Sequence, residues 1–266
     1  MEIYGYIASI FMGLMLGLIG GGGSIMTVPI LVYLFSINPV SATAYSLFIV
    51  GLTALVGGLS YLKKGEVDFK TGFIFAVPSF IGVYLARAYV VPQLPDPVFT
   101  LGAMSVSKPL VIMLVFAILM VAASLSMVRS QKKATQPKEI SKWKRTVLVS
   151  VEGLVVGGIT GFVGAGGGFL IIPALVLLVG MPMKIAVGTS LFIIAAKSLL
   201  GFIGDLQQQT NIEWQLLFSL SGIAIIGLIL GVMMSKRVPE KLLKKGFGYF
   251  VLVMGTIILL DQIRKI

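Results

Sequence analysis

Two glycine-rich runs are the part of this sequence best suited to binding a small anion. The first reads Gly20-Gly-Gly-Gly23-Ser24, and the second, 144 residues later, reads Gly164-Ala-Gly-Gly167-Gly168. Consecutive glycines permit unusual backbone angles and close approach of a ligand. The free N–H groups at the start of a following helix, with the positive end of its dipole, form an anion site. We therefore expect backbone contacts with an anion from Gly22, Gly23, Ser24, Gly166, Gly167 and Gly168.

One lysine and four hydroxyl side chains could complete such a site. Lys197 lies 13 positions after Lys184, roughly 20 Å along a helix, and an ionisable residue that deep in a membrane span marks a functional site by default. Seven residues are about two helical turns, so Ser190 shares a face with Lys197, and Ser46 shares one with Thr53. The side chains expected to contact an anion are Ser46, Thr53, Thr189, Ser190 and Lys197.

Each of these residues also has a purely structural interpretation. Glycines let membrane helices pack closely, although a four-glycine run repeated at the same place favours binding. Lys197 could reach the outer surface or pair with a carboxylate such as Glu152 or Asp205. Arg87, near the end of its apolar segment, could attract anions at an entrance, but a side chain extended to the interface is favoured there.

Composition sets the class of protein. The 266 residues are 57% hydrophobic and 12% charged, with a mean hydropathy of +1.03, which indicates an integral membrane protein. The chain has no cysteine and no histidine, which argues against disulfides and against haem, iron–sulfur and zinc sites, so we expect no cofactor and no metal. With no carboxylate near the middle of a span either, the usual nucleophiles and general bases are missing, and we do not expect an enzyme.

An internal repeat organises the chain. Laying residues 17–61 on 161–205 without a gap gives 15 identities in 45 positions, which indicates a duplication. The predicted fold is an all-α polytopic helical bundle of two five-segment repeats, each with a short helix after its glycine run, at 25–36 and 169–180. Pro29 and Pro173 would lie in an early turn of these helices, where a missing N–H costs little. The predicted units are a first membrane repeat at 1–128, a basic linker at 129–145 and a second repeat at 146–266.

An odd number of segments per repeat inverts the second copy relative to the first. The linker carries seven Lys or Arg residues, and counting segments outward from it places 16 basic residues on its side and four on the other. The positive-inside rule then makes the linker cytoplasmic and puts both termini outside. We expect a multi-pass protein of the cell membrane, with the lipid bilayer as its surroundings. Its net charge of +11 reflects this topology and not a nucleic-acid partner.

At these residues the chain resembles the sulfite exporter TauE/SafE family of membrane permeases. The motifs that carry the resemblance are Gly20 to Pro29 and Gly164 to Pro173, the stretches that begin at Ala42 and Ala186, and the basic linker. The resemblance implies transport of sulfite, sulfonates, related sulfur oxyanions or other small organic anions, in either direction. A secondary active transporter that works by alternating access is the favoured interpretation, and an anion channel built on the same helix ends is the alternative. A coupling proton or cation, and the oligomeric state, stay open.

Overall fold

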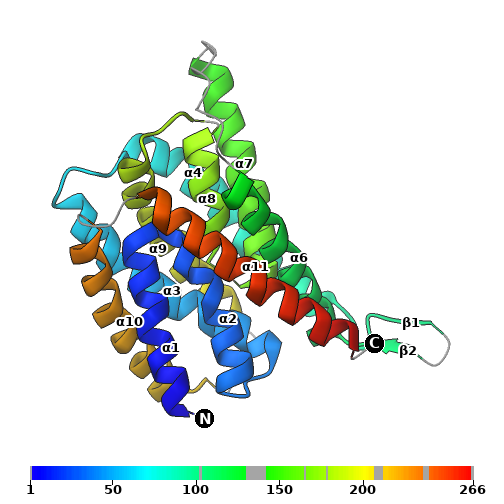
Figure 1. The fold of residues 1–266 in the computed structure, drawn as a ribbon. Helices are drawn as coiled ribbons and strands as arrows, with labels where there is room; N and C mark the ends of the chain where they lie inside the picture. The colour runs from blue at the N-terminus through cyan, green and yellow to red at the C-terminus, as the bar shows by residue number, and fades with distance from the viewer. Residues whose placement is uncertain are drawn as a thin grey trace.

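The chain folds almost entirely into helices packed side by side (Figure 1). The computed structural model describes residues 2–101, 104–129, 142–164, 166–177, 179–206, 212–235 and 240–264, so most of the predicted linker lies outside the described residues. Six helices in this part of the chain are long and apolar enough to cross a membrane, which confirms the predicted helical membrane fold. The long helices are α1 (Glu2–Ile19), α3 (Pro39–Leu62), α4 (Phe69–Leu85), α6 (Lys108–Arg129), α7 (Lys142–Val163), α9 (Met183–Leu206), α10 (Trp214–Met234) and α11 (Glu240–Arg264).

The remaining elements are short. A broken helix follows α1 and consists of η1 (Gly21–Met26), α2 (Thr27–Pro29) and η2 (Ile30–Leu34), and its counterpart in the second half is α8 (Gly168–Leu177). The π-turn η3 (Ala86–Val90) and α5 (Val91–Gln93) extend α4, and strands β1 (Phe99–Leu101) and β2 (Met104–Val106) form a small antiparallel hairpin before α6.

Local sequence signals explain where the central helices begin. The side chain of Asn38 accepts a hydrogen bond from the N–H of Val40 at 2.9 Å, and Pro39 occupies the first turn of α3, where its missing N–H has no cost. Asp68 caps α4 in the same way through the N–H of Thr71. These caps fix the register of the helix that carries Ser46 and of one helix that packs against Lys197's helix.

The helix before each glycine run turns back at the run and does not continue across the molecule. The end of the broken helix returns to the beginning of α1, where the rings of Tyr6 and Phe35 lie 5.5 Å apart. Helices α7 and α8 form the equivalent hairpin at the opposite face (Figure 1). The sequence left open whether these segments span the membrane, and the structure shows hairpins whose tips are the glycine runs.

The predicted bounds of the two short helices differ from the observed ones. The first begins at Gly21, not at residue 25, because the glycines themselves form the tight turn η1. The second begins at Gly168 and ends at Leu177. Pro29 consequently lies well inside the broken helix, not in an early turn, and since it cannot donate to the carbonyl one turn earlier, the helix changes from tight to wide winding around it.

Helices of the two halves pack on each other in reciprocal pairs. Helix α1 packs on α10 as α7 packs on α4, while α3 packs on α9, α6 on α11 and η1 on α8. The contact of α1 with α10 is the counterpart of the contact of α7 with α4, and the other three pairs each join equivalent segments of the two predicted repeats. A two-fold relation between the halves produces this pattern. The halves interleave, so no single plane separates residues 1–128 from 146–266.

Small residues make these contacts close. A Cβ added at Gly13 or Gly17 of α1 would collide with carbonyl oxygens of α10, and one added at Gly157 of α7 would collide with the carbonyl of Ser79 in α4. Gly17, the first glycine of the repeated motif, therefore serves helix packing, as small residues do in membranes. The glycines from Gly20 onward form the break itself.

Candidate functional site

The two glycine breaks meet at the centre of the bundle. A Cβ on Gly21 would collide with the Cα of Gly168, and a Cβ on Gly168 would collide with the Cα of Gly21, so the two chains touch backbone to backbone. Gly20, Gly164 and Gly167 have φ near +72°, a conformation that glycine adopts without the steric cost of a Cβ. The glycines and Ser24 are buried, so in this conformation the meeting point is closed to solvent.

Helix α3 forms one wall of the second break. Gly164 lies against the backbone of Thr43, and a Cβ on Gly166 would stand 2.7 Å from Cγ1 of Val50 and 3.3 Å from Cβ of Ser24. Ser46 lies between the two α3 contacts on the same side of the helix. Its hydroxyl is buried and has no hydrogen-bond partner among the described residues. An anion at this break would find an unused hydroxyl donor there.

Lys197 of α9 forms the other wall. Its side chain is fully buried, and its ammonium donates a hydrogen bond to Oγ1 of Thr160 in α7 at 2.7 Å. The ammonium reaches the backbone of the break, because a Cβ on Gly167 would stand 2.6 Å from Nζ. Lys197 therefore does not reach the surface. In the part of the chain that the structure describes, neither Glu152 nor Asp205 pairs with it, so both structural alternatives are wrong.

The ammonium retains binding capacity. It carries three N–H donors, of which one goes to Thr160, and a buried ammonium without a counter-ion is electrostatically unfavourable. An anion placed beside Gly167 would supply both the charge and the missing acceptor. The hydroxyl of Thr160 in turn donates to the carbonyl of Gly157 at 3.2 Å, which leaves its lone pairs for the ammonium.

The first break occupies the equivalent place in the other half but has no charged side chain beside it. Gly20 lies beside α9, where a Cβ would stand 3.1 Å from Oγ of Ser190. Three of the hydroxyls expected to contact an anion are already committed: Ser190 donates to the carbonyl of Val187, Thr53 to that of Ile49 and Ser24 to that of Gly21. Of the two equivalent breaks, the second one, with Lys197 and Ser46, is the one equipped for an anion.

Thr189 makes a contact between helices that the sequence did not predict. Its hydroxyl accepts a hydrogen bond from the N–H of Asp68 at 2.9 Å, at the start of α4. The equivalent residue in the first half, Tyr45, accepts from the N–H of Glu213 at 3.0 Å, at the start of α10. These two bonds tie α9 to α4 and α3 to α10, one at each face of the bundle.

Arg87 is placed differently from the sequence expectation. Its side chain does not extend to the interface but is fully buried. Its Nη1 lies 3.4 Å from Oδ1 of Asp205, the last residue but one of α9. The π-turn η3 carries it into the bundle. The guanidinium has no hydrogen bond, and Oδ2 of Asp205 has none among the described residues.

Sequence reasoning missed Thr160, the partner of Lys197. The repeat gives the signal that could have found it, because continuing the alignment back by one position places Thr160 on Leu16. Thr160 is a hydroxyl where the other half has leucine, one turn before the glycine break, and the same half also gains Lys197. These two changes together indicate a polar pair. No group of three metal-ligating side chains occurs among the described residues.

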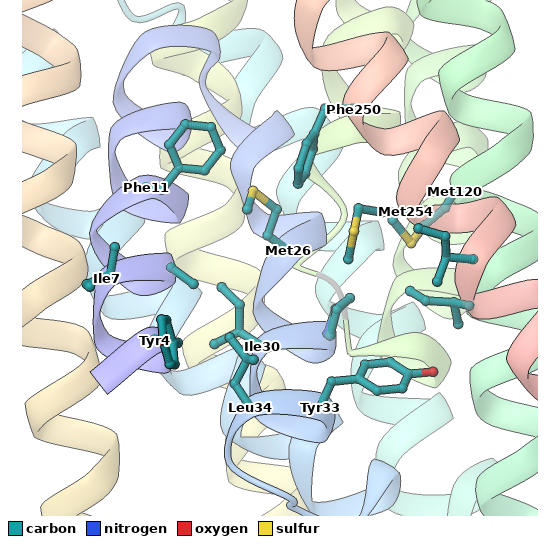
Figure 2. Close-up of a pocket in the computed structure, with 14 residues that line it drawn as sticks. Tyr4, Ile7, Phe11, Met26, Ile30, Tyr33, Leu34, Met120, Phe250 and Met254 are labelled. Carbon is teal, nitrogen blue, oxygen red and sulfur yellow. The ribbon is translucent and has the colours of Figure 1, made fainter. Parts of the chain in front are cut away.

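The large apolar groove of the molecule lies elsewhere and suits no anion. Figure 2 shows its lining, which comes from α1, the broken helix, α6 and α11 and includes Phe11, Met26, Met254 and Phe250. Its volume is about 510 Å³. The hydroxyl of Tyr33, one of its lining residues, donates to Asp261 at 3.0 Å and accepts from Gln262, so it is already used.

Comparison with known proteins gives a consistent picture. Residues 6–258 match the family described as Sulfite exporter TauE/SafE. The chain is 29% identical over 255 residues to a probable membrane transporter protein of Xylella fastidiosa strain Temecula1, covering 93% of this chain and 90% of that protein. It is 28% identical to the probable membrane transporter protein YunE of Bacillus subtilis, covering 97% and 98% of the two chains. It is 24% identical to the probable membrane transporter protein MJ0441 of Methanocaldococcus jannaschii, covering 96% and 94%. No solved structure matches the chain.

Proposed function

This chain belongs to the sulfite exporter TauE/SafE family and is a multi-pass membrane transporter, and from that premise we propose that it carries small oxyanions such as sulfite or sulfonates across the cell membrane as a secondary active transporter. The observation that carries the proposal is Lys197: a fully buried ammonium, deep in α9, with one hydroxyl partner and no carboxylate among the described residues. A membrane protein places such a charge where its function requires it.

The substrate binds at the second break. Lys197 supplies charge, Ser46 supplies an unpaired hydroxyl, and the glycines from Gly166 to Gly168 allow close approach of backbone to the anion. Gly22, Gly23 and Ser24 of the first break close the opposite side of the same centre, since Ser24 stands next to Gly166. Ser190 faces the first break. The hydroxyls of Thr53 and Ser190 contribute only after they turn from their own backbone. In this proposal Thr189 joins α9 to the start of α4 near the path of the anion.

The closed centre favours a carrier over a channel. The glycines of both breaks are buried and touch each other, so an anion needs a rearrangement to enter from either side, which is the condition for alternating access. Because the halves interleave, the moving bodies are not the two sequence repeats. They are two groups that each contain helices of both halves. In one group α10 moves with α1 and the broken helix, and in the other α4 moves with α7 and α8.

The orientation follows from the charges. The face at which α6 ends and α7 begins is cytoplasmic under the positive-inside rule, and both termini are then outside. Figure 1 places the two ends of the chain toward one face, as this orientation requires. A proton or a cation gradient would drive net transport.

The test is the replacement of Lys197 by methionine, which keeps the length of the side chain and removes its charge. In proteoliposomes, Lys197→Met should abolish sulfite uptake while the protein keeps its size-exclusion profile. Lys184→Met is the matched control, because Lys184 lies on the same helix but is exposed near its first turn. Uptake by the control should equal that of the wild type.

Sulfite uptake at the wild-type rate by Lys197→Met would remove Lys197 from the site and with it the present proposal. Flux that grows linearly with the driving force and does not saturate would assign a channel in place of a carrier. Counterflow, in which unlabelled sulfite on one side accelerates entry of labelled sulfite from the other, is the result expected for a carrier.

A further inference from the structure

The buried ion pair between Arg87 and Asp205 is unusual in being incomplete. A guanidinium carries five N–H donors and a carboxylate about four acceptor positions. Here one contact of 3.4 Å joins them, and Nε, both Nη atoms and Oδ2 have no hydrogen bond among the described residues. A pair built only to hold two helices together would be expected to use the bidentate geometry that arginine and aspartate readily form.

The pair is also absent from the equivalent place in the other repeat. At the offset of 144 residues, Asp205 corresponds to Tyr61, whose hydroxyl donates to the carbonyl of Gly17. Beyond residue 61 the two halves align after a slip of one residue, which places Arg87 on Val232. At the equivalent place, where Tyr61 and Val232 stand, the fold uses apolar packing and one neutral hydrogen bond. The charged version is not needed for the architecture, so it requires a separate explanation.

The pair lies near Lys197, because Asp205 is on the same helix, α9. Asp205 follows Lys197 on α9 by eight residues, about 12 Å toward the face where the chain ends lie. Between them, Gly201 packs on Val83 of α4, one turn before Arg87. Most of the buried polar atoms without a partner in the described chain occur on these same elements, α4, η3 and α9: Ser79, Arg87, Ser198 and Asp205. An anion that leaves Lys197 toward that face travels beside them.

We infer that Arg87 forms a second oxyanion subsite, in which an anion travelling between Lys197 and the face of the chain ends replaces Asp205 as the partner of the guanidinium. The inference rests on the proposed function, because it assumes that anions reach Lys197. A planar guanidinium presents two parallel N–H groups to two oxygens of a sulfite or sulfonate, so the anion makes the bidentate contact that Asp205 does not make. Asp205 keeps the charge neutral while the subsite is empty.

The test measures equilibrium binding of sulfite to purified protein in nanodiscs, with choline and chloride as the only other ions. The wild type and Lys197→Met establish the central site: loss of at least tenfold in affinity is expected. In the Lys197→Met background, Asp205→Asn removes the competing carboxylate, and we expect sulfite affinity to rise at least tenfold over Lys197→Met alone. Adding Arg87→Gln to that double variant should remove the gain.

Two results would overturn the subsite and leave the proposed function intact: equal affinities for Lys197→Met with and without Asp205→Asn, or a gain that survives Arg87→Gln. Absence of sulfite binding by the wild type would instead contradict the proposed function and the subsite together. If Asp205→Asn fails to fold, Arg87→Met with Asp205→Leu gives a neutral pair of similar volume, which buried ion pairs generally tolerate. With Lys197 intact, this variant should raise the KM for sulfite at the face of the chain ends at least fivefold, and an unchanged KM would refute the subsite.

Discussion

Gly167 is the position where the structure makes its sharpest quantitative prediction. Its φ of +72° is a conformation in which a Cβ costs about 1 to 2 kcal/mol. A Cβ there would also stand 2.6 Å from Nζ of Lys197 and against the side chain of Thr160, so these side chains must shift, which strains the bond between ammonium and hydroxyl. A hydrogen bond to a charged group contributes about 1.5 to 3 kcal/mol. With that bond lost, Gly167→Ala should destabilise the protein by about 2.5 to 5 kcal/mol and weaken anion binding.

Two other glycines separate these contributions. Gly65 has φ +69° with nothing within 4 Å of an added Cβ, so Gly65→Ala should show the backbone cost alone, about 1 to 2 kcal/mol. Gly158, in α7, has ordinary helical backbone and equal space, so Gly158→Ala should be neutral or stabilising by up to about 1 kcal/mol.

The assay is thermal unfolding of the three variants in one detergent, followed by sulfite binding to each. The melting temperature should fall in the order Gly158→Ala, Gly65→Ala, Gly167→Ala, and only Gly167→Ala should lose sulfite affinity. A Gly167→Ala protein that melts with Gly65→Ala and binds sulfite as the wild type does would refute the contact between Lys197 and the second break, and hence the assignment of this break as the anion site.

Two further substitutions examine the same centre from other sides. Thr160→Val removes the hydroxyl that accepts the hydrogen bond of the Lys197 ammonium. We expect sulfite binding about tenfold weaker than in the wild type, or about 1.4 kcal/mol, as measured by titration. Unchanged affinity would show that Thr160 does not position the ammonium. Gly21→Ala forces a Cβ into the backbone of Gly168, so it should yield little folded protein on size exclusion. Gly246→Ala, with open space around it, is the control and should behave as the wild type. A well-folded, transporting Gly21→Ala protein would mean that the breaks do not touch.

The sequence was sufficient to predict the helical membrane fold and the place of both breaks, because runs of apolar residues and of glycine act locally. It was not sufficient to predict the bounds of the short helices, since glycine is compatible with the tight turn at Gly21 as well as with the open chain before Gly168. Nor could periodicity predict that Arg87 turns inward, because the π-turn that carries it depends on packing against α7 and α9.

Side-chain partners were the least predictable part of the site. Ser46 and Ser190 are equivalent in sequence, yet one hydroxyl is unpaired and the other donates to its own backbone. The sequence did not predict that the hydroxyl of Thr189 accepts from the N–H of Asp68, the residue that caps α4, because that contact joins residues 121 positions apart.

The asymmetry of the buried charges connects the two proposals. Three charged side chains are buried in the described part of the chain, Arg87, Lys197 and Asp205, and all three correspond to neutral residues in the other repeat. Asp205 offsets Arg87, which leaves one positive charge in the interior without a partner. An uncompensated charge in a medium of low dielectric constant is strongly unfavourable. The closed, anion-free protein therefore has the free-energy cost of the buried Lys197 ammonium, and one bound anion removes that cost. A monovalent anion would leave the interior neutral, and a divalent one would leave it negative unless a cation or proton entered with it. The buried charges therefore predict that a divalent oxyanion is transported with one more cation or proton per cycle than a monovalent sulfonate.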